Sequence, residues 1–475
     1  MSPAAPPAPA GRAVLAAVSA GVVALGLGVL ALVLMLAAEG ETMGLTALAL
    51  AVGLGLAVAL AKPSPLARLV GVLLLQITQI GGEAGLSAIE VVAGLALVGY
   101  LAQWYVVALA SARPLIRTVF DAAAVAWGTV GLVVAAGLGL MFGADAYDFR
   151  ADLLATLPFL FYLPVKDLCV REDRGAVAIA AVLCAFGVAA SLQNAVLFRN
   201  AISGAAALYE IADARFNVSE ISITAGMLLA LAGAAVARER SRTLGSVALA
   251  GLLLVGLLIT KSRGYWIAGT FGILAMAVVV PGRGRRRIIG YGALGVGILV
   301  ALAVLLFREQ IVLVALGALD RLVSIGSATS DISILNRVAE SAAVWERLRV
   351  NPILGYGWGV QVTHYSIIAE GTRSWAFFHN GYLSLWFKTG LWGVALFMSV
   401  WIGAMARAAW AARRTALPWS IRAPALGAGA AIAAFTPVVI TSNPFAVLDQ
   451  MLIVTLTLAL AHGSADRAAD LLRDA

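Results

Sequence analysis

Long apolar runs are the feature that most constrains this fold. Runs of about 18 to 26 residues with few charges recur along the chain, and about 20 such residues make a helix that crosses a bilayer. Inside a membrane the backbone must satisfy its own hydrogen bonds, which restricts single spanning segments of this length to helices. Only 12% of the 475 residues are charged, about half the fraction in soluble domains. We therefore expect an all-α, polytopic integral membrane protein.

The runs predict about 12 to 14 transmembrane helices. Their approximate ranges are 13–38, 43–61, 66–81, 85–110, 119–143, 153–165, 174–198, 221–237, 244–260, 265–280, 288–307, 390–409, 423–442 and 446–462. The run 153–165 contains two prolines, so we expect a broken or re-entrant piece there. Residues 1–12 are rich in Pro and Ala and are expected to be disordered. Glu90 is the only ionisable residue that we clearly expect to be buried within a span.

Basic residues mark alternate loops of the chain. Lys and Arg concentrate in the cytoplasmic loops of membrane proteins. Here they concentrate at Arg12, Lys62, Arg68, Arg113, Arg117, Lys166, Arg171, Arg174, Arg238, Arg240, Arg242, Arg283, Arg285, Arg286, Arg287, Arg407, Arg413, Arg414 and Arg422. The pattern predicts that these loops and both termini are cytoplasmic. The net charge of +8 therefore reports topology and does not indicate a nucleic-acid partner.

A long polar segment divides the predicted spans into two sets. Spans occupy 13–307 and 390–462, the outer segment is 308–389, and a cytoplasmic tail is expected at 463–475. Ordinary connections have about 4 to 6 residues, so a segment of this length is expected to fold and to carry function. We expect it to be mainly helical.

Three local patterns subdivide the outer segment. Apolar residues at helical spacing between Leu335 and Leu348 predict an amphipathic helix lying on the membrane or on the bundle. Glycines at 355, 357 and 359 predict a flexible turn. A short helix is expected at 381–387, followed by a kink at Gly390.

Cations on the outer side oppose the orientation signal. Arg199 directly follows the run 174–198, and Lys261 and Arg263 lie in a short outer turn. Arginines can clamp a phosphate or diphosphate through bidentate hydrogen bonds. The alternative, in which these side chains reach lipid head groups, explains one arginine more easily than a group of them. Arg337 could serve the same purpose or lie on the polar face of the amphipathic helix.

The chain has three histidines. His379, followed by Asn380, stands where the polar segment meets the next apolar run, which is where a lipid-linked substrate would present its head group. An imidazole titrates near neutral pH and suits general-base catalysis, although a histidine here could also cap or pack a helix. We expect a structural or rim role for His364 and an interfacial role for His462. The sequence has no Asp-x-Asp motif, no His/Cys cluster and no ATP-binding loop, so neither a metal nor a cofactor is predicted.

Three motifs follow one another along the second half of the chain. They are Lys261-Ser262-Arg263-Gly264, then Arg337 and Trp345 leading into Asn351-Pro352-Ile353-Leu354-Gly355-Tyr356-Gly357, and finally His379-Asn380-Gly381-Tyr382-Leu383 running to Thr389-Gly390-Leu391-Trp392-Gly393. Together they resemble the O-antigen ligase and polymerase superfamily of bacterial envelope enzymes. The resemblance implies that His379 matches the family's essential histidine, Arg263 its essential arginine, and Arg199 a second arginine. The interval between Arg263 and His379 is longer than the family pattern, because it includes an extra span and an extended outer segment.

The resemblance implies a GT-C-like, multi-pass glycosyltransferase of the bacterial inner membrane with its site facing the periplasm. Such an enzyme takes a glycan from undecaprenyl diphosphate, without a cofactor, among membrane lipids. A ligase passes the glycan to lipid A-core, and a polymerase passes it to another lipid-linked glycan; the ligase is favoured. The contrasting alternative is a non-catalytic transporter of lipid-linked glycans, which would use the same outer arginines and would not need His379.

Overall fold

The computed structural model describes residues 64–79, 88–111, 113–204, 218–280, 282, 284–291, 293, 297 and 332–474. The predicted N-terminal region 1–12, the spans 13–38 and 43–61, and residues 308–331 of the outer segment lie outside these residues. The chain divides into two compact units, Met1–Leu115 and Ile116–Ala475. Each unit is described by itself below.

Two helical pieces are described in the first unit. Helix α3 (Pro65–Leu75) begins at Ser64, whose hydroxyl accepts a hydrogen bond from the Ala67 N–H, and continues into the 3-10 turn η1 (Gln76–Gln79). Helix α4 (Ala88–Ala110) packs against both. The Gln76 side-chain amide donates to the Ala93 carbonyl at 3.0 Å, which joins the two pieces.

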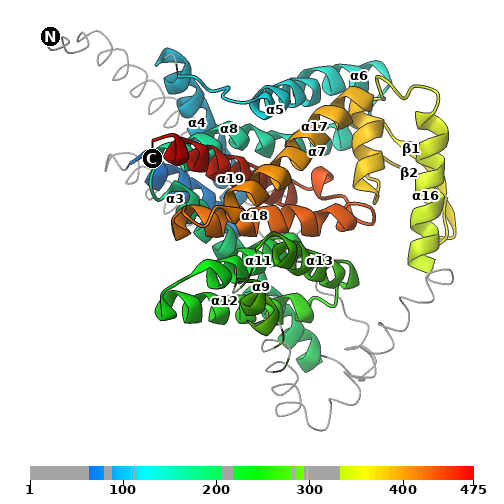
Figure 1. The fold of residues 1–475 in the computed structure, drawn as a ribbon. Coiled ribbons are helices and arrows are strands. Elements are labelled where there is room, and N and C mark those ends of the chain that lie inside the picture. Colours follow the sequence, from blue (N-terminus) through cyan, green and yellow to red (C-terminus); the bar gives the residue numbers. More distant parts are fainter. Residues whose placement is uncertain are drawn as a thin grey trace, which may run out of the picture. The chain divides into compact units, whose positions relative to one another are not determined.

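The second unit is a bundle of helices with one small hairpin (Figure 1). Its elements are α5 (Val119–Thr129), the π-helical turn η2 (Val130–Val134), α6 (Ala135–Met141), α7 (Ala146–Thr156), the 3-10 turn η3 (Leu157–Phe161), α8 (Tyr162–Arg171), α9 (Gly175–Gly204), α11 (Glu220–Val236), α12 (Arg240–Ile259), α13 (Arg263–Val279), α16 (Ile332–Leu348), β1 (Val362–Ser366), β2 (Gly371–Trp375), α17 (Gly381–Arg413), α18 (Trp419–Val438), the 3-10 turn η4 (Pro444–Ala446) and α19 (Leu448–Arg473).

Seven helical stretches among the described residues are long and apolar enough to cross a membrane, and four shorter apolar helices accompany them. The predicted all-α, polytopic membrane architecture is therefore confirmed. The total of about 12 to 14 spans stays a prediction, because it includes residues outside the described part of the chain.

Helix α11 lies at the centre of the second unit. Each of its residues from Glu220 to Val236 is buried, and it packs against α9, α12 and α18. A helix that is apolar on every side must be surrounded by other helices or lipid. Gly427 of α18 faces the Leu229 backbone of α11, where a Cβ atom would come within 2.7 Å of the Leu229 Cα. The glycine therefore permits close approach of the two backbones.

The predicted broken piece at 153–165 belongs to a longer helical run, Ala146–Arg171. The 3-10 turn η3 separates α7 from α8, which confirms that the run is interrupted. Pro158 lies in the first turn of η3 and Pro164 in the first turn of α8. Proline is tolerated at such positions because the first N–H groups of a helix have no partner within it.

The described part of the outer segment has its own small core. Helix α16 confirms the predicted amphipathic helix. It packs against an antiparallel hairpin, in which Val362 is opposite Trp375 and Ser366 is opposite Gly371. The sequence reading did not predict this hairpin. The core formed between them contains Val344, Leu348, Tyr356, Val360, Val362, Phe378 and Phe387.

Helix α16 buries a different face from the one its apolar pattern indicates. The predicted apolar positions Val338 and Trp345 are 60% and 47% exposed. The buried residues are Asn336, Glu340, Val344 and Leu348, which recur every fourth position. Because Asn336 and Glu340 on the buried face are polar, hydrophobic periodicity did not identify that face.

The glycines at 355, 357 and 359 form a packed turn, so the prediction of a flexible turn is wrong. All three have positive φ angles, which favour glycine. The Trp358 N–H donates to the Ala135 carbonyl at 3.0 Å, and the Tyr356 N–H to the Phe387 carbonyl at 2.7 Å. A Cβ atom on Gly359 would lie 2.5 Å from the Phe149 Cα. The turn therefore fixes α17 against α6 and α7.

Helix α17 changes direction at Gly390, as predicted. This residue has φ 68° and ψ −179°, outside the helical region. The Leu391 N–H donates to the carbonyls of Pro352 and Ile353, both at 3.1 Å. The break in the helix leaves the Leu391 N–H without an acceptor inside α17, and carbonyls of the outer segment accept its hydrogen bond instead.

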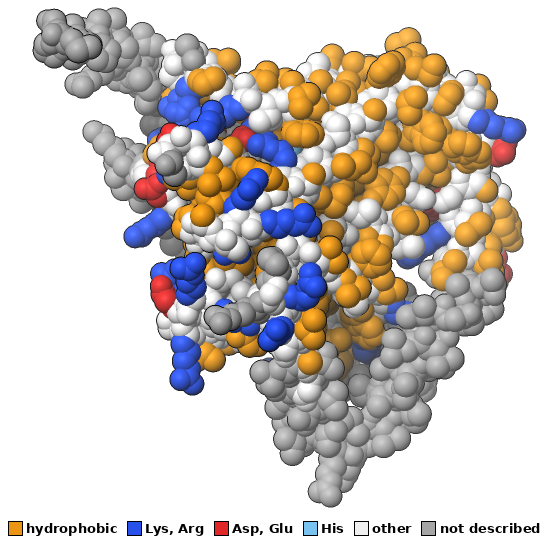
Figure 2. Space-filling view, in the orientation of Figure 1, with side chains coloured by type: hydrophobic (Ala, Val, Ile, Leu, Met, Phe, Trp, Pro, Cys, Tyr) orange, Lys and Arg blue, Asp and Glu red, His pale blue; other side chains and the backbone are white. Residues whose placement is uncertain are grey.

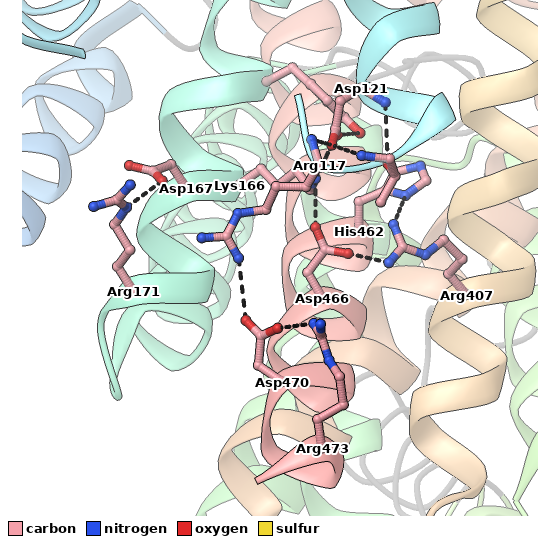
Figure 3. A network of polar contacts seen from close by, with 12 residues as sticks. Arg117, Asp121, Lys166, Asp167, Arg171, Arg407, His462, Asp466, Asp470 and Arg473 are labelled. Atoms are coloured by element: carbon pink, nitrogen blue, oxygen red, sulfur yellow. Dashed lines mark hydrogen bonds and ion pairs between the residues drawn. The ribbon is translucent and has the colours of Figure 1, made fainter. Parts of the chain in front are cut away.

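A buried network of charges joins four helices (Figure 3). The Lys166 Nζ of α8 lies 2.5 Å from both Asp121 carboxylate oxygens of α5 and 2.6 Å from the Asp466 Oδ2 of α19. Arg407 of α17 pairs with Asp466 and donates to the His462 Nδ1 at 3.3 Å. His462 Nε2–H then donates to the Val400 carbonyl at 3.0 Å.

The network lies toward the cationic end of the bundle. Figure 2 shows Lys and Arg side chains gathered over the end where α12 and α18 begin, while hydrophobic side chains cover most of the rest of this face. Helix α19 continues to Arg473, and its last turns pack with residues of α17 and α18. His462 is buried within the bundle, with 0% exposure, while the interfacial position expected for it stays a prediction.

Glu90 was expected to be the only clear buried ionisable residue in the spans, and that expectation is wrong. Asp121 and Lys166 are 0% and 3% exposed, and Asp152 and Lys388 form a second buried pair. The apolar runs end just before or begin just after Asp152, Lys166 and Lys388. A prediction based on those runs alone therefore assigns these residues to loops. Each is paired in the structure, which offsets the free energy of desolvation.

We predict that replacing Lys166 by Met strongly destabilises the protein. The substitution leaves two buried carboxylates without their shared cation, and breaking a buried pair costs about 3–5 kcal/mol. Thermal unfolding of the detergent-solubilised chain, followed by tryptophan fluorescence, measures the effect. The control is Arg242→Ala, which removes an exposed pair with Glu239 and should change stability by less than about 1 kcal/mol. Equal midpoints for the two variants would contradict the prediction.

Candidate functional site

The loop 439–443, between α18 and η4, is the point at which the predicted site segments meet. The Gly381 N–H, at the start of α17, donates to the Val439 carbonyl at 2.8 Å. At the start of α13, a Cβ atom on Gly264 would lie 3.9 Å from the Thr441 Oγ1. Arg263 directly precedes Gly264, and His379 lies two positions before Gly381. The segments that carry Arg263 and His379 therefore both lie beside this short loop, although 115 residues stand between the two in the sequence.

His379 has a buried carboxylate as its partner. The Glu340 Oε2 of α16 lies 2.9 Å from the His379 Nδ1, and the Oε1 accepts the His379 backbone N–H at 2.6 Å. Glu340 is 1% exposed, whereas the His379 side chain is 30% exposed. The ring of Phe377 packs against the imidazole edge-on. These contacts hold both the backbone and the ring of His379 in one position.

The contact with Glu340 also favours one state of the imidazole. A carboxylate next to Nδ1 favours a proton on that nitrogen, which leaves Nε2 as the basic atom in the neutral ring. If Nε2 takes up a proton, the carboxylate stabilises the imidazolium, as in other acid–histidine pairs. The arrangement can therefore accept a proton from a hydroxyl group.

Sequence reasoning missed Glu340. It treated this residue as part of the solvated face of the amphipathic helix. The signal that could have found it is the four-residue spacing of Asn336, Glu340, Val344 and Leu348, which marks a second helical face containing a carboxylate. A buried carboxylate needs a partner, and His379 is that partner.

Asn380 determines where α17 begins. Its side-chain oxygen accepts the Leu383 N–H at 3.1 Å, and its carbonyl accepts the Ser384 N–H at 2.8 Å. This is an N-cap, which satisfies donors in the first turn of a helix. Asn380 thus supports the position of His379, the residue before it.

The predicted outer cations come from two neighbouring segments. Lys261 has a φ of 53° and its Nζ lies 5.9 Å from the centre of the Phe198 ring. Arg199, the next residue of α9, is exposed. Arg263 is half-buried at the start of α13, and the hydroxyl of Ser262, just before it, is a hydrogen-bond partner of the Glu220 carboxylate. The turn between α12 and α13 thus lies beside the end of α9.

Arg337 and His364 belong to the outer segment and lie on its side of the site. Arg337 is half-buried on α16, three residues before Glu340. His364 is 8% exposed in β1, on the strand face that packs toward α16, and its Nδ1 has no hydrogen-bond partner. Both residues thus lie on the unit of α16 and its hairpin, which also carries Glu340.

The contacts of the loop 439–443 bring the starts of α13 and α17 together. That the imidazole of His379 and the guanidinium groups of Arg263 and Arg199 meet over one phosphate stays a prediction. Among the described residues, no group of three or more His, Cys, Asp or Glu side chains is arranged to hold a metal ion.

Residues 248–398 match the family model for O-antigen ligase. This match covers about a third of the chain and supports its assignment to the O-antigen ligase and polymerase superfamily. The matched range runs from α12 into α17 and includes Lys261, Arg263, Glu340 and His379, so the resemblance read from the motifs is confirmed. Arg199 lies before it. No curated protein matches the chain.

The family gives a coarse description of activity. Its members are membrane glycosyltransferase-like enzymes, either ligases or polymerases, which implies lipid-linked glycan and acceptor substrates in a membrane.

We predict that a disulfide forms between Gly264→Cys and Thr441→Cys. A Cβ atom at position 264 would lie 3.9 Å from the Thr441 Oγ1, which is compatible with disulfide geometry after small adjustments. Oxidation of the double variant in membranes, followed by protease cleavage and electrophoresis, measures the cross-link. The control pairs Thr441→Cys with Gly245→Cys, near the opposite end of α12. Equal cross-linking of the two pairs would show that α13 does not begin at this loop.

Proposed function

We propose that this chain is an O-antigen ligase-type glycosyltransferase. It transfers a glycan from undecaprenyl diphosphate to lipid A-core at the periplasmic face of the inner membrane, without a metal. The observation that carries the proposal is the contact between the buried Glu340 and His379, inside the range that matches the family. An imidazole held by a carboxylate at the start of a membrane helix has the chemistry of a general base.

The proposed reaction begins at the acceptor hydroxyl. The hydroxyl proton passes to the His379 Nε2 as the oxygen forms a bond to the anomeric carbon of the donor glycan. Glu340 stabilises the imidazolium that results. A well-placed general base contributes about 10²- to 10⁴-fold to a rate.

The bond between the anomeric carbon and the diphosphate oxygen breaks in the same step. Its electron pair leaves with undecaprenyl diphosphate, so one displacement inverts the configuration at the anomeric carbon. The leaving group is an anion, and its growing charge is stabilised by Arg263, Arg199 and Lys261 through charge-assisted hydrogen bonds. Asn380, Arg337 and His364 support the acceptor side of the site.

Replacing His379 by Ala should lower kcat by at least about 10²-fold, because it removes the proposed acceptor of the hydroxyl proton. Glu340→Gln should also reduce kcat, because a neutral amide cannot stabilise the imidazolium. Transfer of glycan from purified lipid-linked donor to lipid A-core, followed by gel mobility, measures both. Glu346→Gln is the control, because Glu346 is exposed on the same helix and pairs with Arg349. Near-normal turnover of a folded His379→Ala variant would remove His379 from the base role.

Replacing Arg263 by Ala should raise the KM for the lipid diphosphate about 10- to 100-fold, because charge-assisted hydrogen bonds contribute about 1.5–3 kcal/mol each. The KM of Arg263→Lys should lie between those of the original chain and Arg263→Ala, since a lysine keeps the charge and loses the bidentate geometry. Donor titration in the same assay gives the values. Arg242→Ala, at the other end of α12, serves as the control. An unchanged donor KM in Arg263→Ala would exclude this residue from diphosphate binding.

The same assay separates the ligase from a polymerase of the superfamily. Both would share the donor half of the site. A ligase modifies lipid A-core, whereas a polymerase lengthens the lipid-linked donor even when lipid A-core is present. A transporter would do neither, and its substrate binding would be insensitive to His379→Ala.

A further inference from the structure

Three arginines gather around the end of α11, at the cationic end of the bundle (Figure 2). Arg238 follows α11 directly, Arg287 comes from the segment after α13, and Arg422 lies in the first turn of α18. The Arg287 Nη1 donates to the carbonyl of Ala237, the residue before Arg238, at 2.5 Å. The charges of Arg238 and Arg422 are close enough to repel each other. Three segments that are distant in the sequence thus bring three positive charges together.

These three arginines have no carboxylate to balance them. The sequence from 221 to 307 contains one acidic residue, Glu239, and the sequence from 390 to 448 contains none. Glu239 pairs with Arg242 at 2.9 Å, so its charge is already matched. Among the described residues, none of the three arginines forms an ion pair. The end of α11 therefore carries an excess of positive charge.

Two ordinary roles of basic residues leave this arrangement unexplained. A cation beside the last carbonyls of a helix stabilises that helix, which accounts for Arg287 alone. A basic loop sets the orientation of a span, but this role requires neither burial nor mutual approach. Arg287 and Arg422 are half-buried, and the Arg422 Nε donates to the Ala412 carbonyl at 3.2 Å. Like charges that are partly removed from water raise the free energy of the fold unless an anion lies between them.

The chemistry of the three side chains favours a phosphate as this anion. A guanidinium group presents its N–H donors in a planar fork that matches two oxygens of a phosphate. Arg238 is exposed, so a ligand can reach the group from outside the bundle.

The surroundings favour a phosphate that belongs to a lipid. Exposed apolar side chains lie within a few residues of the arginines: Leu244 of α12 is 58% exposed, Val278 of α13 is 68% exposed, and Ile289 is 59% exposed. In a protein whose helices cross a membrane, such side chains contact lipid chains. Basic pockets between the ends of membrane helices bind anionic lipid head groups.

We propose that Arg238, Arg287 and Arg422 form a binding site for the head group of an anionic phospholipid. The phosphate oxygens accept hydrogen bonds from the guanidinium groups, and the acyl chains lie along α12 and α13. Arg242 takes no part, because Glu239 is its partner. The site is separate from the proposed glycosyl transfer and does not depend on it.

Native mass spectrometry of the detergent-solubilised full chain tests the site directly. The chain is titrated with phosphatidylglycerol and, separately, with phosphatidylcholine, which has the same phosphate and no net charge. Phosphatidylglycerol should bind more tightly. Arg238→Gln and Arg422→Gln should each weaken its binding about tenfold, because each removes a charged donor to the phosphate.

Thermal unfolding provides the second readout. A ligand that binds only the folded chain raises the unfolding temperature, so phosphatidylglycerol should raise it in the original chain and less in Arg238→Gln. The matched control is Arg473→Gln, which removes the same charge from an exposed side chain that pairs with Asp470. This control should bind phosphatidylglycerol as the original chain does.

Three results would overturn the site. Equal affinity for the two lipids would show that no anionic head group is selected. Unchanged binding in Arg238→Gln and Arg422→Gln, or equal weakening in Arg473→Gln, would show only a general attraction between a cationic protein and an anionic lipid. Displacement of phosphatidylglycerol by an equal concentration of inorganic phosphate would assign the three arginines to a soluble anion.

Discussion

The buried ion pair between Asp152 and Lys388 is the interaction on which the packing around the start of α17 depends. A lone charge at this depth would carry a large desolvation cost, so each partner requires the other. The carboxylate also accepts the Gly359 N–H, and the Lys388 carbonyl accepts the Gly357 N–H. One pair thus holds α7, α17 and the glycine turn together.

Glu340 extends this arrangement to the candidate site. Helix α16 packs on the hairpin and on the core that includes Tyr356 and Phe387, so its position is tied to α17. From there Glu340 contacts both the backbone and the ring of His379. The loop 439–443 contacts the starts of α13 and α17. Residues that the sequence spreads over three segments are therefore positioned by contacts between rigid helices.

Apolar runs were sufficient to predict the helical membrane architecture, and spaced motifs were sufficient to indicate the family. The ends of the membrane segments were harder to predict. Polar residues such as Asp152 and Lys388 resemble loop residues in a sequence, and only the structure shows that they pair with each other. Glu340 was missed for the same reason. Its burial depends on a hairpin whose strands, around His364 and Arg373, have no strong alternating pattern. The packed glycine turn also required a tertiary contact, since positive φ angles alone fit a mobile loop equally well.

The break at Gly390 has a mechanical consequence for α17. Above it, residues 381–389 are held by the Asn380 cap, the pair with Asp152 and the core around Phe387. Below it, the helix runs on to Arg413 among α5, α18 and α19. The two arms of α17 are therefore braced by different neighbours, the short arm after His379 by α7 and the glycine turn and the long arm by the helices of the bundle. A displacement of the long arm must cross the break at Gly390 before it reaches the residues beside His379.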